Sequence, residues 1–157
     1  MRRKDREITN KEEIIELIKK CSVCRLAFYD EEYPYIVPMN FGYSSQEESI
    51  ELFFHCATKG KKLELLCNNP KVGFEMDCNH KLILGEKDCN STMEYESICG
   101  NGILEILPED KKVYALTQLM KQYSKKDEFK FEEKDLKAVH VLKLSVHNIY
   151  AKQLKLS

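Results

Sequence analysis

The sequence predicts a mainly β domain, in which a small antiparallel barrel carries a few helices at its periphery. Three observations lead to this fold class. Short runs of β-forming residues recur along the chain, polar turn residues separate them, and the few helical patterns do not alternate with strands as βαβ units require. The length of 157 residues fits a single domain, 1–157, which can bury roughly two-thirds of its unfolded surface.

β-branched and aromatic residues between polar turns predict the strands. The predicted strands are 23–29, 34–43, 50–56, 71–78, 95–106 and 138–146. Residues 79–92 are mixed and polar, which predicts a loop with at most a short strand at 81–84. Residues 149–154 either continue the last strand or pair separately.

Proline and glycine mark special positions in two of these strands. Proline cannot donate a ladder hydrogen bond, so Pro38 predicts a break in pairing within strand 34–43. Either a ligand occupies the resulting gap or the strand forms an ordinary edge bulge. Gly100 and Gly102 predict a bend, or a close approach of two backbones, in strand 95–106.

Three segments are predicted to be helical, at 10–20, 61–68 and 109–123. Asn10 and Glu13 have the spacing of a capping box at the start of the first helix. Its buried face is expected to hold Ile14, Ile15, Leu17, Ile18 and Cys21. The buried stripe of the third helix is expected to hold Val113, Leu116, Met120 and Tyr123.

The remaining segments are polar. Residues 1–9 are predicted to form a mobile arm, and the charged residues 124–135 to form a surface loop. The first residues carry charge without an apolar segment behind them, which is not the pattern of a signal peptide. A cytoplasmic location is therefore expected.

The formal net charge of −1 provides no overall field to attract nucleic acid or an anionic membrane. No apolar run approaches the roughly 20 residues that span a bilayer. We therefore expect neither nucleic acid nor membrane as a partner. The seven cysteines are expected to be free thiols, because the sequence has no secretion signal.

Zinc-like spacing occurs at Cys21-x-x-Cys24, and Cys78 lies two residues before His80. A single cysteine pair without a second pair is weak evidence for zinc, and the βαβ context of a redox dithiol is missing. Small buried thiols are common in such positions. The sequence therefore predicts no metal site.

The segment 58–62 contains a glycine and three lysines and leads into the helix at 61–68. Amide groups at a helix start, next to Lys61 and Lys62, suit a phosphate monoester. The alternative is that both lysines are simply solvated. A strand end followed by such a loop could hold a phosphorylated aromatic cofactor.

Five segments of the chain carry a resemblance to a known family. They are MRRKDREI, CSVCRLAFYD, PYIVPMNFGY, LFFHCATKGKKLELLCNNPKVGFE and YESICGNGILE, in this order from Met1 to about Glu105. The chain resembles the flavin-binding split-barrel family that includes pyridoxamine 5′-phosphate oxidase, and in particular its Nim-type branch of 5-nitroimidazole resistance proteins. The resemblance implies a six-stranded antiparallel split barrel of the FMN-binding type, in a homodimer with the flavin at the interface.

The resemblance also implies a set of cofactor-binding residues. Lys61 and Lys62 match the basic pair that holds the flavin phosphate, and His55 and Cys56 match the strand end beside the ring. Ser97 matches a position that is a flavin-contacting glutamine in the oxidase branch, so this chain departs from that pattern. The segment that lines the isoalloxazine ring is matched by Val37, Pro38, Met39 and Asn40. FMN is the expected cofactor, with FAD as the alternative.

His55 is the predicted catalytic residue. It interrupts an apolar strand directly before the lysine loop, and in the Nim-type branch the matching histidine lies close to the flavin. A histidine titrates near neutral pH and can supply the protons that accompany electrons in nitro reduction. The alternative is a histidine at a strand end that only bonds to backbone.

Three functions follow from the resemblance. The first is an FMN-dependent nitroreductase, an oxidoreductase acting on small nitroaromatics such as 5-nitroimidazoles. The second is the pyridoxamine phosphate oxidase reaction, although the C-terminal sequence NIYAKQLKLS lacks the arginine-bearing substrate motif of that enzyme. The third is a flavin- or haem-binding protein without turnover.

Overall fold

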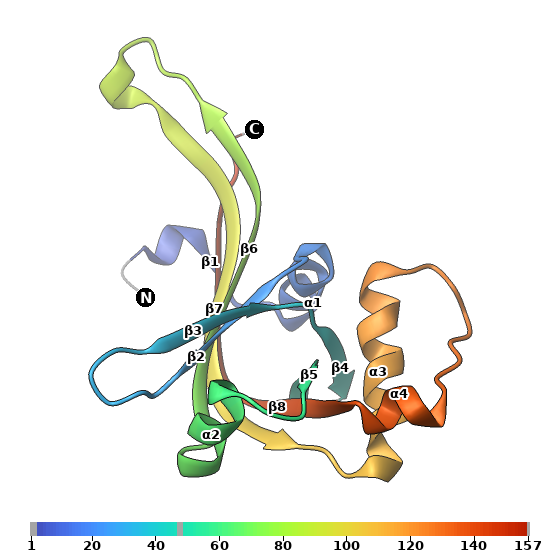
Figure 1. Cartoon of the computed structure of the whole chain (residues 1–157). Helices are drawn as coiled ribbons and strands as arrows, with labels where there is room; N and C mark the ends of the chain where they lie inside the picture. The colour runs from blue at the N-terminus through green and yellow to red at the C-terminus, as the bar shows by residue number, and fades with distance from the viewer. Residues whose placement is uncertain (1–2, 47–48, 157) are drawn as a thin grey trace.

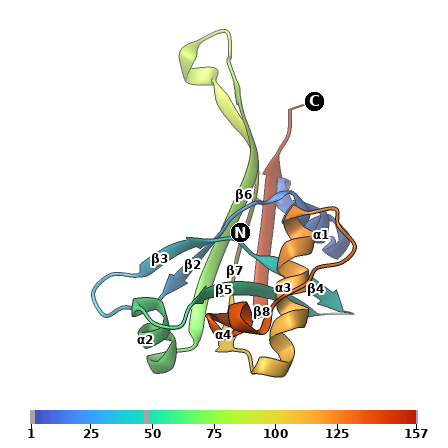
Figure 2. The same ribbon diagram turned by 45° about the vertical axis from the view of Figure 1, so that its right-hand side comes forward.

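The computed structural model describes residues 3–46 and 49–156, and Figures 1 and 2 show its ribbon from two sides. The strands of this described part are β1 (Glu7–Ile8), β2 (Cys24–Phe28), β3 (Tyr35–Met39), β4 (Gly42–Gln46), β5 (Ser49–Ala57), β6 (Lys71–Ile83), β7 (Thr92–Ile106) and β8 (Val139–Leu154). Its α-helices are α1 (Lys11–Lys20), α2 (Lys61–Asn68), α3 (Glu109–Tyr123) and α4 (Glu133–Lys137). Two 3₁₀ turns, η1 (Lys4–Arg6) and η2 (Asp88–Asn90), complete the elements.

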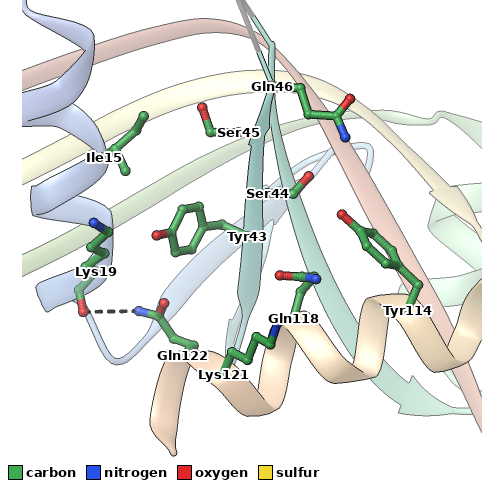
Figure 3. A pocket seen from close by; sticks show the side chains of 10 residues that line it. All are labelled: Ile15, Lys19, Tyr43, Ser44, Ser45, Gln46, Tyr114, Gln118, Lys121 and Gln122. Carbon is green, nitrogen blue, oxygen red and sulfur yellow. Dashed lines mark hydrogen bonds between the residues drawn. The ribbon is translucent and has the colours of Figure 1, made fainter. Parts of the chain in front are cut away.

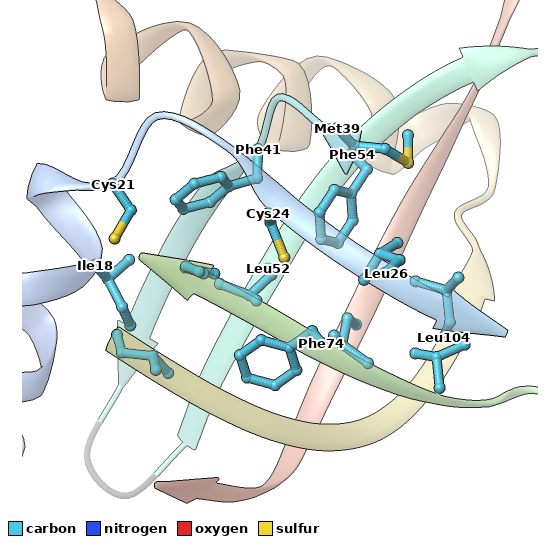
Figure 4. Packing of buried hydrophobic residues seen from close by; sticks show 14 of the residues in the cluster. Ile18, Cys21, Cys24, Leu26, Met39, Phe41, Leu52, Phe54, Phe74 and Leu104 are labelled. Atoms are coloured by element: carbon cyan, nitrogen blue, oxygen red, sulfur yellow. The ribbon is translucent and has the colours of Figure 1, made fainter. Parts of the chain in front are cut away.

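The strands form one antiparallel sheet in the order β3-β2-β6-β7-β8-β5-β4, and β1 pairs with β8. The sheet rolls around a single main core, because side chains from both halves of this order belong to one buried cluster. Figure 4 shows Leu26 from β2, Phe54 from β5 and Phe74 from β6 within that cluster. Removing these apolar groups from water is the main stabilising contribution to the fold. The predicted fold class, mainly β with peripheral helices, is confirmed.

The described sheet has eight strands, two more than predicted, because two segments behave differently from their sequence patterns. The predicted strand 34–43 consists of β3 and β4, which are separated by Asn40 and Phe41. The predicted mobile arm 1–9 contains β1, in which Ile8 pairs with Ala151 and is only 7% exposed. A single buried isoleucine thus attaches this otherwise polar segment to the sheet.

The predicted break within strand 34–43 occurs, but it lies between Met39 and Gly42 and not at Pro38, which pairs with Arg25 in an unbroken ladder. The described strand β3 stands at one end of the strand order, and proline is tolerated on such an edge because its missing donor faces away from the ladder. The pairing ends only after Met39.

Gly100 and Gly102 lie at the predicted close approach of backbones. A Cβ atom on Gly100 would overlap the Phe74 ring, and one on Gly102 would overlap the Ser145 carbonyl oxygen. The register between β7 and β8 also shifts between Asn101 and Gly102. Both glycines are therefore required by packing, as the sequence predicts.

Strands β6 and β7 continue into a long hairpin that projects beyond the barrel (Figures 1 and 2). Their pairing runs on from Lys81–Glu94 to Ile83–Thr92 after an irregularity between Cys78 and Lys81. The predicted loop 79–92 is therefore too long. The prediction failed because a strand pair away from the core has no alternation of buried and exposed residues.

The predicted buried stripe of α3 is wrong. The residues that face the sheet are Lys112, Ala115 and Leu119, whereas Val113, Met120 and Tyr123 are largely exposed. A Cβ atom on Gly42 would overlap the backbone of Leu119, so the helix packs directly against β4. The absence of a side chain on Gly42 makes this close contact possible, and an apolar periodicity in the helix does not reveal it.

The other segments are close to their predictions. Helix α1 begins after Asn10, whose side-chain oxygen accepts a hydrogen bond from the Glu13 amide at 3.1 Å, and buries the expected face. Strand β8 continues without interruption through 149–154, which decides between the two alternatives. The predicted surface loop 124–135 ends in α4. No helix within residues 3–46 and 49–156 is long and apolar enough to cross a bilayer.

Candidate functional site

The start of α2 is open to a ligand. Gly60 is the N-cap residue, with a φ of 135° that side chains disfavour, and no side chain caps the helix. A Cβ atom added to Gly60 would meet no atom within 4 Å. The Gly60 carbonyl oxygen accepts hydrogen bonds from the amides of Leu63 and Glu64, so the loop geometry is fixed. The first turn thus presents a positive dipole end to open space.

The two lysines of this turn have different surroundings. Lys61 forms an ion pair with Asp30 at 2.5 Å, and its ammonium lies 5.3 Å from the centre of the Tyr35 ring. The hydrogen bond to Asp30 raises the pKa of Lys61. Lys62 is half-buried, and its ammonium lies 3.7 Å from the Met39 sulfur. Among the described residues no carboxylate pairs with Lys62, so its charge is the one available to an anion.

Met39, Cys56 and Lys62 lie together at one end of the barrel. Met39 and Cys56 are both buried members of the main core cluster. Burial raises the pKa of the Cys56 thiol, and the nearby charge of Lys62 offsets part of this rise. Val37 is half-buried and packs against the same core. Met39 and Cys56 thus lie close to the Lys62 ammonium, which has no carboxylate partner in the described part of the chain.

His55 lies on the opposite face of β5 from Cys56. It is exposed, while its neighbours Phe54 and Cys56 are buried, as expected for successive residues of a strand. Its partner across the sheet is Val141 in β8. The imidazole is therefore accessible from outside the barrel.

The other two residues of the predicted ring-lining segment, Pro38 and Asn40, are exposed. The Asn40 amide donates a hydrogen bond to the Ser22 carbonyl oxygen at 3.3 Å, which fixes the chain where β3 ends. Residues 37–40, 55–56 and 61–62 thus belong to neighbouring chain segments at one corner of the molecule.

Ser97 is not part of this corner. Its partner in β8 is Lys152, whereas the partner of His55 is Val141, eleven residues away along the same strand. At about 3.3 Å per residue this separation is roughly 36 Å along the strand. The Ser97 side chain is buried, yet its hydroxyl has no hydrogen-bond partner in the described part of the chain.

The donor set of the corner fits a flavin phosphate. An uncapped helix start, a flexible ammonium without an acidic partner and an apolar surface are the groups that a phosphorylated aromatic molecule uses. Lys62 and the α2 amides would hold the phosphate, and residues 37–40 with His55 would lie along the ring. Asp30 and Tyr35, which position Lys61, were not identified from the sequence, because no spacing rule connects residues 26 to 31 positions apart.

Metal ligation has no comparable site. Cys21 and Cys24 are both buried, and burial raises the pKa of each thiol. A search of the described residues found no group of three histidine, cysteine or acidic side chains able to hold a metal ion.

Comparison with known proteins relates the whole chain to a family. The sequence profile described as "Pyridoxamine 5'-phosphate oxidase" matches residues 10–153. A candidate 5-nitroimidazole antibiotic resistance protein from Bacteroides thetaiotaomicron is 31% identical in sequence, with a TM-score of 0.81; the match covers 94% of this chain and 86% of that one. The comparison with curated proteins found no match.

Two further solved structures share the fold at low identity. The FAD and haem binding protein from Mycobacterium smegmatis is 19% identical, with a TM-score of 0.83, over 96% of this chain and 74% of that one. The flavocytochrome Anf3 from Azotobacter vinelandii is 14% identical, with a TM-score of 0.81, over 99% of this chain and 72% of that one. The shared fold is the split β-barrel that the sequence predicts. With nearly its whole length matched by the family profile, the chain belongs to the pyridoxamine 5′-phosphate oxidase family.

Proposed function

We propose that this protein binds a flavin with its phosphate at the start of α2. The observation that carries the proposal is the Lys62 ammonium, which has no acidic partner among the described residues and lies beside an uncapped helix start. Lys61 strengthens the positive field there although Asp30 already pairs with it. We take FMN as the cofactor, because it ends in the phosphate monoester that this turn suits, and FAD as the alternative.

We propose further that the flavin lies between two copies of the chain. Pro38, His55 and Lys61 are exposed at the surface of a single chain, and Ser97 lies too far from them to join the same site. A second copy could bring the β7 segment around its own Ser97 to the ring. The functional unit would then be a homodimer.

The reaction we propose is reduction of a small nitroaromatic compound such as a 5-nitroimidazole. A bound flavin would supply the electrons. Two electrons and two protons convert the nitro group to a nitroso group and release one oxygen as water. His55 would supply these protons from its exposed imidazole and regain them from solvent. The apolar surface around Val37 and Met39 would orient the planar substrate. The relative from Bacteroides thetaiotaomicron, described as a candidate resistance protein for such compounds, supports this substrate class.

A second candidate is a flavin- or haem-binding protein without turnover. Two proteins of the same fold are described as an FAD and haem binding protein and as a flavocytochrome, which favours this alternative over the pyridoxamine phosphate oxidase reaction. An absorption spectrum distinguishes the two cofactors, because flavin and haem absorb at different wavelengths.

The cofactor proposal is tested by purifying the protein with excess FMN and measuring the bound flavin. Wild type should retain one flavin per chain, and Lys62→Ala should bind it at least about tenfold more weakly, because a charge-assisted hydrogen bond is worth roughly 1.5–3 kcal/mol. Lys59→Ala, which removes an exposed lysine of the preceding loop, should bind normally. Full retention by the Lys61→Ala/Lys62→Ala double variant would refute the phosphate assignment.

The role of His55 is tested with chemically reduced, flavin-loaded protein and a 5-nitroimidazole. His55→Ala should retain flavin but consume the nitro compound about 10²-fold more slowly, as expected when a general acid is lost. His147→Ala, at another exposed histidine, should react like wild type. Equal rates for all three proteins would exclude His55 as the proton donor, and no reaction in any of them would favour the binding protein.

A further inference from the structure

A second cavity lies away from the flavin corner, between α1, β4 and α3. Its volume is about 660 Å³, within the usual range for small-molecule sites. Figure 3 shows the rings of Tyr43 and Tyr114 on its walls and the side chains of Lys19 and Lys121 at its rim. We call this cavity the helix groove. It shares no lining residue with the flavin corner.

The walls of the helix groove are fixed by hydrogen bonds. The Gln122 amide of α3 donates to the carbonyl oxygens of Ile18, Lys19 and Cys21 at the end of α1, at 2.9–3.3 Å. The Tyr123 hydroxyl donates to the Ser22 carbonyl oxygen at 2.8 Å and accepts from the Phe41 amide at 2.9 Å. The three elements around the groove are thus tied together, so a ligand would not have to order them.

The polar groups that line the groove are mostly unused. The side chains of Tyr43, Ser45, Tyr114, Gln118 and Lys121 line it, and within the described residues none of them forms a side-chain hydrogen bond or ion pair. Lys19 pairs with Glu16 at 2.5 Å, so its charge is partly compensated. Ser44 of the lining donates to Glu51 at 3.2 Å. Lys121 is the lining lysine that has no carboxylate partner within residues 3–46 and 49–156, so its ammonium and the unused donors are available to an anion.

We propose that the helix groove binds a small aromatic anion, such as an aromatic carboxylate or the phosphate monoester of an aromatic compound. The tyrosine rings would hold the flat apolar part of the ligand, and Lys121, assisted by Lys19, would bind its charged group. The Tyr114 hydroxyl and the Gln118 side-chain amide would donate hydrogen bonds to the other oxygens of the ligand's charged group. This site is independent of the flavin proposal.

The test is isothermal titration calorimetry with benzoate and phenyl phosphate as probes. At least one of them should bind saturably at one site per chain, and inorganic phosphate and benzyl alcohol should each bind about tenfold or more weakly, because each lacks one of the two recognised parts. Lys121→Gln should weaken binding of that probe about tenfold, which corresponds to about 1.4 kcal/mol. Lys125→Gln removes the same charge from an exposed position outside the groove and should change the affinity less than about twofold, since solvent screens distant charges.

Several outcomes would overturn the proposal. The proposal is wrong if neither aromatic anion binds, or if benzyl alcohol binds as tightly as benzoate. It is also wrong if Lys121→Gln and Lys125→Gln weaken binding equally. If the Lys61→Ala/Lys62→Ala variant loses binding of the probe, the anion binds at the flavin corner and not in the helix groove. Retained binding in that variant, with loss in Lys121→Gln, would support the groove.

Discussion

Glu96 is a buried carboxylate at the base of the projecting hairpin, and it connects three distant segments. Only 3% of its side chain is exposed. Lys20 of α1 donates to it at 3.0 Å, Lys155 near the C-terminal end pairs with it at 2.8 Å, and Asn79 of β6 donates a third hydrogen bond. Burial alone would raise the pKa of Glu96. The hydrogen bonds from Lys155, Lys20 and Asn79 outweigh this effect, so the pKa is lowered to about 2.

The Glu96 cluster predicts how stability depends on pH. Because the folded pKa lies below the usual value of 4.5, the ionised group stabilises the fold above about pH 4.5, and this contribution is lost as the pH falls toward 2. Glu96→Gln should lower the free energy of unfolding at pH 7 by on the order of 2 kcal/mol, since the partner lysines are partly solvated. Urea unfolding at pH 7, 4 and 3 measures this, and the difference from wild type should narrow with falling pH.

The exposed Glu133→Gln provides the control, because its 81% exposed carboxylate pairs only with Lys137 on the surface. It should change the free energy of unfolding by less than about 0.5 kcal/mol at each pH. A Glu96→Gln variant as stable as wild type at pH 7 would mean that the cluster contributes no net stability.

Single residues differ in how far the sequence reveals their roles. The Asn10 cap was predictable, because donor and acceptor lie three residues apart in one turn. The burial of Lys112 could not be predicted. Its ammonium donates to the carbonyl oxygens of Leu136 and Val139, which lie about 25 residues later in the chain. The Asp30–Lys61 ion pair could not be predicted for the same reason, because its two residues are far apart in the sequence. Contacts set by tertiary packing leave no local pattern.

At the scale of elements, the sequence predicted most of those that lie on the core, but it missed the two-residue β1 and the parts that extend away from the core. Helix α2 was predicted at 61–68, its observed range, because its apolar residues and the following Asn-Asn-Pro mark both limits. The far end of the β6–β7 hairpin and the short α4 have few buried residues, so no periodicity marks them. For the candidate site, the sequence analysis grouped the 55–62 segment with Ser97, and no sequence pattern indicates the distance between them along β8.

The α2 element gives a prediction about Gly60. At a φ of 135°, Gly60→Ala would strain the backbone although the space around it is open, and should destabilise the start of α2 by about 1–2 kcal/mol. Flavin retention should fall with it, because the helix amides would no longer be aligned. Equilibrium dialysis with FMN measures this, and thermal unfolding records the stability.

Gly73→Ala is the matched control. A Cβ atom on Gly73 would have its nearest contact at 3.8 Å, and its φ is ordinary, so the variant should fold and bind flavin like wild type. If Gly60→Ala retained flavin as well as Gly73→Ala, the conformation of the α2 start would not matter for binding.

At the scale of the whole molecule, the antiparallel topology places Ser97 and the lysine corner at different ends of β8. A side-chain movement cannot bring them together, because roughly 36 Å of hydrogen-bonded strand separates Val141, which pairs with His55, from Lys152, which pairs with Ser97. If both contact the same flavin, they must come from different copies related by two-fold symmetry.

This geometry predicts complementation between two defective variants. Lys61→Ala/Lys62→Ala should lose flavin at the phosphate end, and Ser97→Phe should lose it by blocking the ring. When the two are unfolded, mixed in equal amounts and refolded, about half of the dimers should be mixed, and each of these has one intact site. Bound flavin should therefore recover to about one quarter of the wild-type amount, since a symmetric dimer has two sites. Each variant refolded alone should recover none, and a mixture that also recovers none would show that Ser97 and the lysines do not share a site across an interface.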